Sequence, residues 1–367
     1  MRQSEEFGEL TEEQEKVIDS IRPRKIVLPI VIGIAVIIYL LSRQLDIDEL
    51  RAIRWTGYAM FWIGISVAVY MLRHLLNSWR LKVLSEGDFS WWKSIELVTI
   101  LEFASAVSPT NFGGSAVAFF LLIQERISGA RATAIVIYTI VADTVIFVIT
   151  LPLLYFLFGD SIFVPAKEIH TVWGGLLVTL FIVWVIMTVY GTLLLYGLFI
   201  QPRHLKNLLL VFSKWRIFGG TRKKIKQAAF EIEESSIHIR SQPFFFHFKT
   251  SLATLVAWIF RFFSISAILI AVSPSMSQTL YDHFILLGRG EALYAVTAYS
   301  PTPGGSGVAE ILFGQFYSEY ISRGIAVVAA ILWRLVTYYP YLFLGVIIIP
   351  NWILKILNRR RAEKVAH

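Results

Sequence analysis

Long apolar stretches separated by short polar segments run through most of this chain. Six of these stretches have roughly the 17–25 residues that a helix needs to cross a bilayer, and they lie near 26–42, 56–76, 132–158, 172–200, 244–272 and 324–350. They predict six full membrane crossings. Two further apolar segments, about 90–124 and 281–317, are each interrupted by a Pro/Gly turn, and the part after the turn is too short to span alone.

The two interruptions resemble each other, although they lie about 190 residues apart in the chain. Residues 108–118 read SPTNFGGSAVA, and residues 300–309 read SPTPGGSGVA. In lipid, a broken helix is tolerated only where its freed backbone groups face protein or a water-filled cavity. Paired interruptions in the two halves of a membrane protein indicate a transport site. The sequence therefore predicts an internal repeat, with repeat 1 at about 56–158 and repeat 2 at about 244–350.

The distribution of positive charge adds an orientation to this pattern. Of the 34 Lys and Arg residues, the densest groups lie in the loop 201–243 and in the tail 351–367. Loops rich in Lys and Arg remain in the cytoplasm. We therefore predict a transmembrane domain at 26–350 in a cell membrane, with a cytoplasmic or interfacial N-terminal segment 1–25, a basic cytoplasmic loop 201–243 and a basic cytoplasmic tail 351–367.

On this map the two interrupted segments enter the membrane from opposite sides. Arg80 and Arg126 flank the first segment on the cytoplasmic side, whereas Asp282 and Glu319 flank the second on the external side. This predicts an all-α polytopic membrane protein with about six full transmembrane helices plus two opposed re-entrant helical hairpins in an inverted-topology repeat. The alternative is that 90–108 crosses as an ordinary helix, which gives eight or more spans.

The overall composition excludes several classes of protein. With 56% hydrophobic and 16% charged residues, the chain is not a water-soluble globule. It has no Cys, its seven His lack metal-ligand spacing, and it lacks the nucleotide-binding and zinc-protease motifs. We expect no metal, no cofactor and no catalytic domain. The net charge of +8 is spread over loops beside the apolar spans, so we expect no nucleic-acid partner.

The Gly-Gly-Ser turns are candidate binding positions. Glycine lets the backbone approach a ligand closely, and a half-helix that starts after such a turn offers free N–H groups to a phosphate or carboxylate. We expect Ser115 and Ser306 to be the N-caps of these half-helices. The candidate contacts are Thr110, Asn111, Gly113, Gly114 and Ser115 in the first turn, and Thr302, Gly304, Gly305 and Ser306 in the second. The alternative is a purely structural turn that closes each hairpin.

Ionisable side chains inside the apolar segments are a second group of candidates, because each costs on the order of 2.5–3.5 kcal/mol at the bilayer centre. Glu310 follows the second turn, and its counterpart after the first turn, Phe119, is not ionisable. Asp143 and Arg334 lie 29 residues after the second glycine of their respective turns. They could pair with each other across the pseudo-twofold axis, or Arg334 could hold an anionic headgroup.

Four more charged residues lie in or near apolar segments. Arg261, within the sequence WIFRFF, is deep enough in its predicted span to need a partner, and Glu102 lies closer to a segment end. Arg289 and Glu291 are expected at the membrane interface. Arg261 and Glu102 therefore join the candidate binding residues.

The second repeat resembles a known motif. The string PTPGGSGVAE at 301–310, followed by Arg334, is similar to the transmembrane region of lysylphosphatidylglycerol synthetases and of related stand-alone, flippase-like membrane proteins. The resemblance covers roughly residues 26–350. The first repeat, with Pro109, Gly113 and Gly114, matches the looser N-terminal version, and the region of Arg80 resembles the basic loop after the second span.

This resemblance implies the movement of a lipid with a modified headgroup between leaflets. In the fused enzymes a soluble domain makes the aminoacylated phospholipid and the membrane region flips it, and archaeal relatives are associated with polyprenyl-linked sugars. Because the chain ends at His367, soon after the last predicted span, we expect no synthetase domain and no synthetase activity.

The leading hypothesis is a lipid translocase for a phospholipid or a polyprenyl-phosphate-linked lipid, which acts alone, as a homo-oligomer or with a partner lipid-modifying enzyme. The alternatives are an intramembrane enzyme that acts on a lipid-linked phosphate or sugar, with Glu310 as general base, and a non-transporting membrane partner of a separate enzyme.

Overall fold

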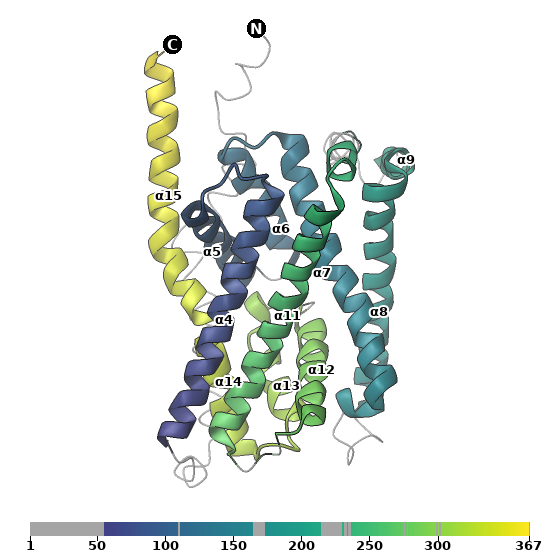
Figure 1. Ribbon diagram of the computed structural model, residues 1–367, viewed down its shortest axis with the longest axis vertical. Coiled ribbons are helices and arrows are strands. Elements are labelled where there is room, and N and C mark those ends of the chain that lie inside the picture. The colour runs from purple at the N-terminus through teal and green to yellow at the C-terminus, as the bar shows by residue number, and fades with distance from the viewer. Residues whose placement is uncertain are drawn as a thin grey trace.

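The computed structural model describes residues 55–108, 111–163, 173–213, 236–274, 278–298 and 302–366, together with residues 230, 233, 276 and 300. Every regular element in these residues is helical. The predicted segment 1–25, the first predicted span 26–42 and most of 214–235 lie outside the described residues. The element labels are those of Figure 1, including the gaps in their numbering.

The long helices among the described residues include α4 (Gly57–Leu84), α7 (Gly129–Phe158), α8 (Trp173–Leu195) and α11 (Phe244–Val272) (Figure 1). Near the end of the chain, α14 (Arg323–Thr337) continues into α15 (Tyr339–Ala366). Within the described residues, five helical stretches are long and apolar enough to cross a membrane, at Gly57–Leu84, Arg131–Ile162, Val178–Ile200, Phe244–Val272 and Gly324–Ile356. They match the five predicted spans that fall in the described residues.

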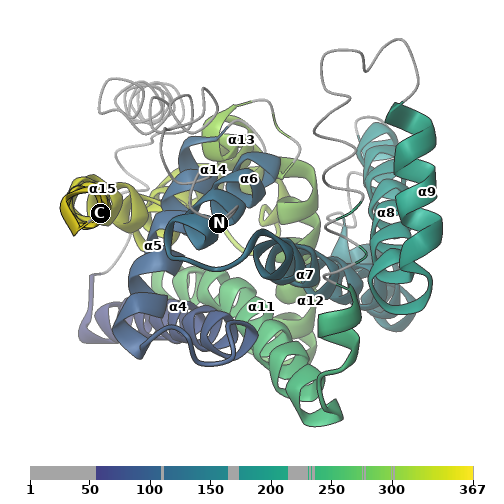
Figure 2. The same ribbon diagram turned by 90° about the horizontal axis from the view of Figure 1, so that it is seen from above.

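The most extensive helix pair is α4 with α11, which lie side by side in both views (Figures 1 and 2). Small residues are buried on the two helices, among them Ala59 and Ser66 on α4 and Ala253 and Ala257 on α11. The Ser66 hydroxyl donates a hydrogen bond to the backbone oxygen of Ser264 at 2.9 Å. Small residues let two helix backbones approach closely, which is the main source of helix association where no hydrophobic effect operates.

Two helical hairpins pack against these long helices. One consists of α5 (Trp91–Val107) and α6 (Asn111–Gln124), and the other of α12 (Leu280–Thr297), the short helix η4 (Pro303–Gly305) and α13 (Val308–Phe316). In Figure 1 the α5–α6 hairpin lies in the half of the bundle nearer the C-terminus, and α12 and α13 lie in the other half. Helix α5 packs against η4, so the turn regions of the two hairpins are in contact.

The remaining elements lie at the edges of the bundle. The short helix η1 (Gly159–Ile162) follows α7, and the π-helical turn η2 (Tyr196–Ile200) joins α8 to α9 (Pro202–Ser213). Figure 2 shows α8 and α9 at one edge and α15 at the opposite edge. The bundle between these edges therefore consists of α4, α7, α11 and α14 around the two hairpins.

Polar caps define where the hairpins begin. The Ser90 hydroxyl accepts from the backbone N–H of Lys93 at the start of α5. At the start of α12, Thr279 and Asp282 form a reciprocal capping box. Both caps are at the ends of the hairpins that face away from the contact between the turns.

Candidate functional site

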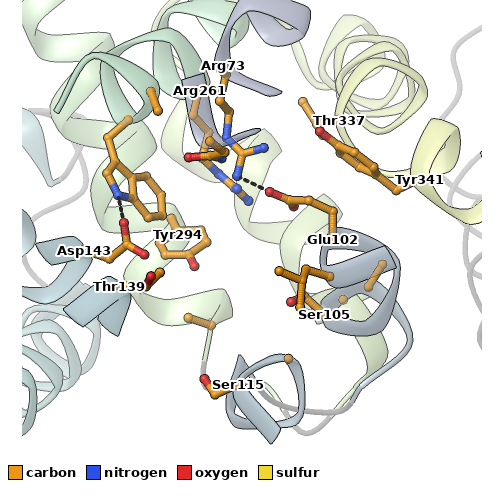
Figure 3. Close-up of a pocket in the computed structure, with 18 of the residues that line it drawn as sticks. Arg73, Glu102, Ser105, Ser115, Thr139, Asp143, Arg261, Tyr294, Thr337 and Tyr341 are labelled. Atoms are coloured by element: carbon orange, nitrogen blue, oxygen red, sulfur yellow. Dashed lines mark hydrogen bonds and ion pairs between the residues drawn. The ribbon is translucent and has the colours of Figure 1, made fainter. Parts of the chain in front are cut away.

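A cavity of about 410 Å³ lies between the two hairpins (Figure 3). Both turn regions line it, and α4, α7, α11 and α14 complete its wall. The predicted site residues that line it are Glu102, Gly114, Ser115, Asp143, Arg261, Thr302, Gly304, Gly305 and Arg334. Thr110 lies outside the described residues, and so do the surroundings of Asn111 and Gly113.

Two arginines of α4 are the largest correction to the sequence-based interpretation. Arg80 was expected to flank the first interrupted segment on the cytoplasmic side, but α4 continues to Leu84, and both Arg73 and Arg80 are buried in the wall of the cavity. They are seven residues apart and share one helix face. Arg73 pairs with Glu102 of α5 at 2.8 Å, as Figure 3 shows.

Asp143 of α7 pairs with Arg80, and not with Arg334. The Arg80 Nη1 atom lies 2.8 Å from Asp143 Oδ1 and also donates to the Thr254 hydroxyl at 3.0 Å. The Trp258 indole N–H donates to the same carboxylate oxygen at 3.0 Å. Of the two alternatives left open for Arg334, a pair with Asp143 across the pseudo-twofold axis is not formed, because α4 rather than α14 presents the cation opposite Asp143.

Arg334 instead pairs with Glu310, and both residues form hydrogen bonds with the backbone of the second turn. The Arg334 Nε atom is 2.6 Å from Glu310 Oε1, and Nη1 donates to the Gly304 carbonyl at 3.0 Å. Glu310 Oε2 accepts from the backbone N–H of Gly307 at 2.7 Å. The third nitrogen, Nη2, is buried and has no hydrogen-bond partner among the described residues. Arg334 lines the cavity, whereas Glu310 lies behind it.

The start of each returning half-helix differs from the prediction. Ser115 is the fifth residue of α6, and Ser306 precedes α13, whose N-cap is Gly307. Neither serine is therefore an N-cap. At α13 the capping oxygen comes from Glu310, and Ser306 is buried beside the Tyr338 hydroxyl.

Arg261 differs from the other cavity arginines. Its guanidinium carbon lies 5.3 Å from the Trp258 ring centre and 4.6 Å from that of Tyr294, so it stacks on two aromatic faces. Among the described residues, no carboxylate forms an ion pair with it and no atom hydrogen-bonds its guanidinium. Figure 3 shows it pointing toward the interior, near Arg73 and Glu102. Its partner is thus aromatic, and its hydrogen-bond donors remain available.

The charges that line the cavity favour an anion. Four arginines (Arg73, Arg80, Arg261 and Arg334) and two acidic residues (Glu102 and Asp143) face it. A buried positive charge is costly unless an anion or hydrogen-bond acceptors compensate it. Arginine is also the residue best suited to bidentate contacts with phosphate or carboxylate. The cavity therefore has the chemistry to bind a small anionic group.

Arg289 and Glu291, which were expected at the membrane interface, are both buried. Arg289 donates to the backbone oxygens of Ser161 and Phe316 and pairs with Glu319 at 2.5 Å. It therefore links the middle of α12 to η1 and to the end of α13. Glu291 lies one residue from Gly290 in the cavity wall, but it does not line the cavity.

Arg73, Arg80, Trp258 and Tyr294 are the site residues that the sequence interpretation missed. A usable signal was present for the first two, because Tyr70, Arg73, Asn77 and Arg80 recur every three or four residues and form one polar stripe on a helix. Trp258 and Tyr294 gave no such signal, since aromatic residues are common on lipid-facing and interfacial surfaces.

An all-helical membrane protein with a polar cavity between two helical hairpins is the class that these features define. The family model described as the lysylphosphatidylglycerol synthase TM region matches residues 26–345, and the chain belongs to this family. A UPF0104 membrane protein of Archaeoglobus fulgidus is 25% identical over 292 residues, which cover 77% of this chain and 83% of the relative. No solved structure matches the chain.

Proposed function

We propose that this protein is a lipid translocase, which moves a lipid with an anionic headgroup between leaflets while the tails remain in the bilayer. The observation that carries this proposal is the cavity between the hairpins, where arginines outnumber acids and both Arg261 and Arg334 Nη2 have hydrogen-bond donors without an acceptor among the described residues. A phosphate would supply those acceptors. The family match and the five candidate spans support a membrane-embedded role.

The proposal includes a topology. The α5–α6 hairpin is re-entrant from the cytoplasm and the α12–α13 hairpin is re-entrant from the external side, and their turns meet at the cavity. The helix ends near the start of α5, the start of α11 and the C-terminus carry Lys82, Lys93, Arg131, Lys249 and Lys355. This concentration of positive charge supports a cytoplasmic assignment for that end of the bundle in a cell membrane.

The topology has a direct test, because the chain has no Cys. Single-cysteine variants Arg126→Cys and Ser318→Cys place one thiol at the base of each hairpin, and both positions are exposed. We expect a membrane-impermeant maleimide to label Ser318→Cys from outside intact cells and Arg126→Cys only after permeabilisation. Labelling of both from the same side would contradict opposed hairpins.

The translocase itself is tested by leaflet exchange in proteoliposomes of the full chain. The panel contains fluorescent phosphatidylglycerol, phosphatidylcholine and a polyprenyl phosphate, with protein-free liposomes as the control. We expect exchange of at least one anionic lipid, faster than that of phosphatidylcholine. If no lipid exchanges faster than in protein-free liposomes, the translocase proposal fails, and the intramembrane enzyme and the partner role remain to be examined.

A further inference from the structure

Glu291 of α12 is a buried carboxyl group outside the cavity. Only 2% of the residue is exposed, and its Oε1 atom lies 2.6 Å from the hydroxyl oxygen of Thr150 on α7. Among the described residues no cation pairs with it. A buried carboxylate is strongly disfavoured unless it is paired with a cation or becomes neutral. The surroundings of Glu291 therefore favour its protonated form.

The hydrogen bonds of Thr150 lead to the same conclusion. Its hydroxyl oxygen lies 2.8 Å from the backbone oxygen of Ile146 and 2.6 Å from Glu291 Oε1. A hydroxyl has one hydrogen to donate, and a carbonyl or a carboxylate oxygen can only accept. Both contacts are full hydrogen bonds when Glu291 carries a proton and donates it to Thr150, which in turn donates to Ile146. Ionised Glu291 would draw the Thr150 hydrogen away from Ile146.

The contact between Glu291 and Thr150 lies close to a proline inside α7. Pro152 stands inside the helix and has no N–H to donate to the backbone oxygen of Val148. The indole N–H of Trp184 from α8 donates to that oxygen instead, at 3.3 Å. Helices kink at proline, where a backbone hydrogen bond is missing. A change in the Thr150 hydrogen bond therefore acts on the part of α7 that bends most easily.

The other charged and titratable groups on α12 and on the elements packed against it do not neutralise Glu291. Helix α12 packs against α7, α8, α11, α13 and η1, and Figure 2 shows α7 beside it. None of their groups forms a hydrogen bond or ion pair with Glu291 in the part of the chain that the structure describes. These groups are Arg131, Tyr138, Asp143 and Tyr155 on α7, Tyr190 on α8, His247, Lys249 and Arg261 on α11, Glu310 on α13, Asp160 on η1, and Tyr281, Asp282, His283, Arg289 and Tyr294 on α12.

We propose that Glu291 is a proton-binding site and that its charge state controls the contact between α7 and the α12–α13 hairpin. In the arrangement described here Glu291 holds the proton. Release of this proton to water leaves a carboxylate that takes the Thr150 hydrogen bond and loosens α7 beside Pro152. The proton site stands independently of lipid movement, whereas its coupling to lipid movement rests on the proposed function.

Infrared difference spectroscopy of the full chain in lipid tests the proton site directly. The carbonyl stretch of a protonated carboxylic acid should be present in the wild type at neutral pH and absent in Glu291→Gln. It should shift in frequency in Thr150→Val, which removes the hydrogen-bond partner. The matched controls are Asp160→Asn, which removes an exposed acid on η1, and Thr188→Val, which removes a similar helix hydroxyl on α8. Identical spectra for wild type and Glu291→Gln would overturn the proposal.

The coupling is tested by lipid exchange in proteoliposomes between about pH 5 and about pH 9, a range that spans the protonation of a buried glutamate. We expect the wild-type rate to change about tenfold, a size typical of coupling between two sites, and the Glu291→Gln rate to stay constant. Equal pH dependence in both would overturn the coupling and leave the proton site intact. A protonated Glu291 in a chain that exchanges no lipid would overturn the proposed function alone.

Discussion

The turn of the α12–α13 hairpin is held by a buried ion pair, whereas the turn of the α5–α6 hairpin is held by close helix packing. Arg334 binds both Glu310 and the Gly304 carbonyl of the second turn. At the first turn, a Cβ added to Gly114 would lie 2.3 Å from the Ser105 hydroxyl oxygen, so α5 and α6 are in contact there. Two copies of nearly the same sequence thus reach the cavity with different local structures.

The hairpins also differ at their bases. Lys93 at the start of α5 pairs with Glu125, which follows α6, at 2.5 Å. Around the same end, Arg131 pairs with Asp88 at 2.8 Å. The first hairpin is therefore anchored by ion pairs near its base, whereas the second has one buried ion pair at its turn and another, Arg289 with Glu319, near the end of α13. Two of the three guanidinium nitrogens of Arg334 therefore serve the second turn, whereas Arg261 of α11 has no ion pair among the described residues and stacks on two aromatic rings.

Removal of the Glu310 side chain should have the largest effect on stability. Glu310→Ala leaves the Arg334 charge buried without its anion, a loss of roughly 3–5 kcal/mol in the free energy of unfolding. Unfolding in mixed detergent micelles measures it. The double variant Glu310→Ala/Arg334→Met should recover part of the loss, because it removes the unpaired charge as well.

The base of the first hairpin supplies the matched comparison. Glu125→Gln also removes a carboxylate, but its partner Lys93 is 21% exposed and regains water when released. The Glu125 side chain is only 6% exposed, but the amide oxygen of the glutamine can still accept from the Trp352 indole N–H, so we expect a loss of about 1 kcal/mol. Equal losses of unfolding free energy for Glu310→Ala and Glu125→Gln would contradict the proposed difference between the ion pair at the second turn and the ion pair at the base of the first hairpin.

Alanine substitutions of the turn glycines should distinguish backbone strain from steric crowding by neighbouring side chains. Gly304 has a φ of 57°, and an added Cβ would lie 2.3 Å from the Tyr338 ring. Gly114→Ala and Gly304→Ala should each cost about 1–3 kcal/mol. Ser105→Ala should rescue Gly114→Ala almost fully, because the Ser105 hydroxyl causes the clash. Tyr338→Leu should rescue Gly304→Ala only in part, since the left-handed backbone still costs about 1 kcal/mol. Full rescue at both turns would show that the turns are equivalent.

The smallest effect is expected at the exposed turn that precedes α5. Partial burial raises the pKa of the Glu86 carboxyl, but its hydrogen bond with His238 and the charge of Arg131 outweigh this effect and hold the pKa below its ordinary value. A lowered pKa stabilises the fold above the unfolded-state pKa of about 4.3, and this stabilisation disappears as the pH falls through the folded-state pKa.

We therefore expect Glu86→Gln to lower the free energy of unfolding by at most about 1 kcal/mol at neutral pH, because exposed pairs contribute little. The gap between wild type and variant should close in acid. Unfolding curves of both proteins at neutral and acidic pH measure this, and a gap that widens in acid would contradict the lowered pKa.

Much of the fold follows from the sequence. Apolar length alone predicts the five candidate spans, and the repeated SPT and GG residues predict two interrupted segments at the correct positions. Proline and glycine inside an apolar run leave few alternatives to a turn in protein-enclosed surroundings. The re-entrant entry of the hairpins stays a prediction, because it depends on where a bilayer lies around the bundle.

The partners of the charged residues were harder to predict. Glu310 and Arg334 were recognised as important, but the pair that they form depends on which helix face α14 turns toward the second turn. Arg80 was assigned to a cytoplasmic flank because Lys and Arg are enriched in such flanks, and Arg73 was not recognised as a site residue. The prediction that Ser115 and Ser306 are helix N-caps was wrong, because α6 starts before its Gly-Gly pair, whereas α13 starts after Gly307. Sequence spacing alone does not fix such local backbone choices.

The central claim is that Arg261 offers its charge to the headgroup of an anionic lipid. The most direct measurement is the leaflet exchange rate of the anionic lipid that the wild type moves, in proteoliposomes that contain Arg261→Gln or the control Arg203→Gln. Arg203 lies on α9 and its side chain is 84% exposed. A charged hydrogen bond contributes about 1.5–3 kcal/mol, so Arg261→Gln should slow exchange about tenfold or more, with Arg203→Gln at the wild-type rate. Exchange by Arg261→Gln as fast as by the wild type would contradict the claim.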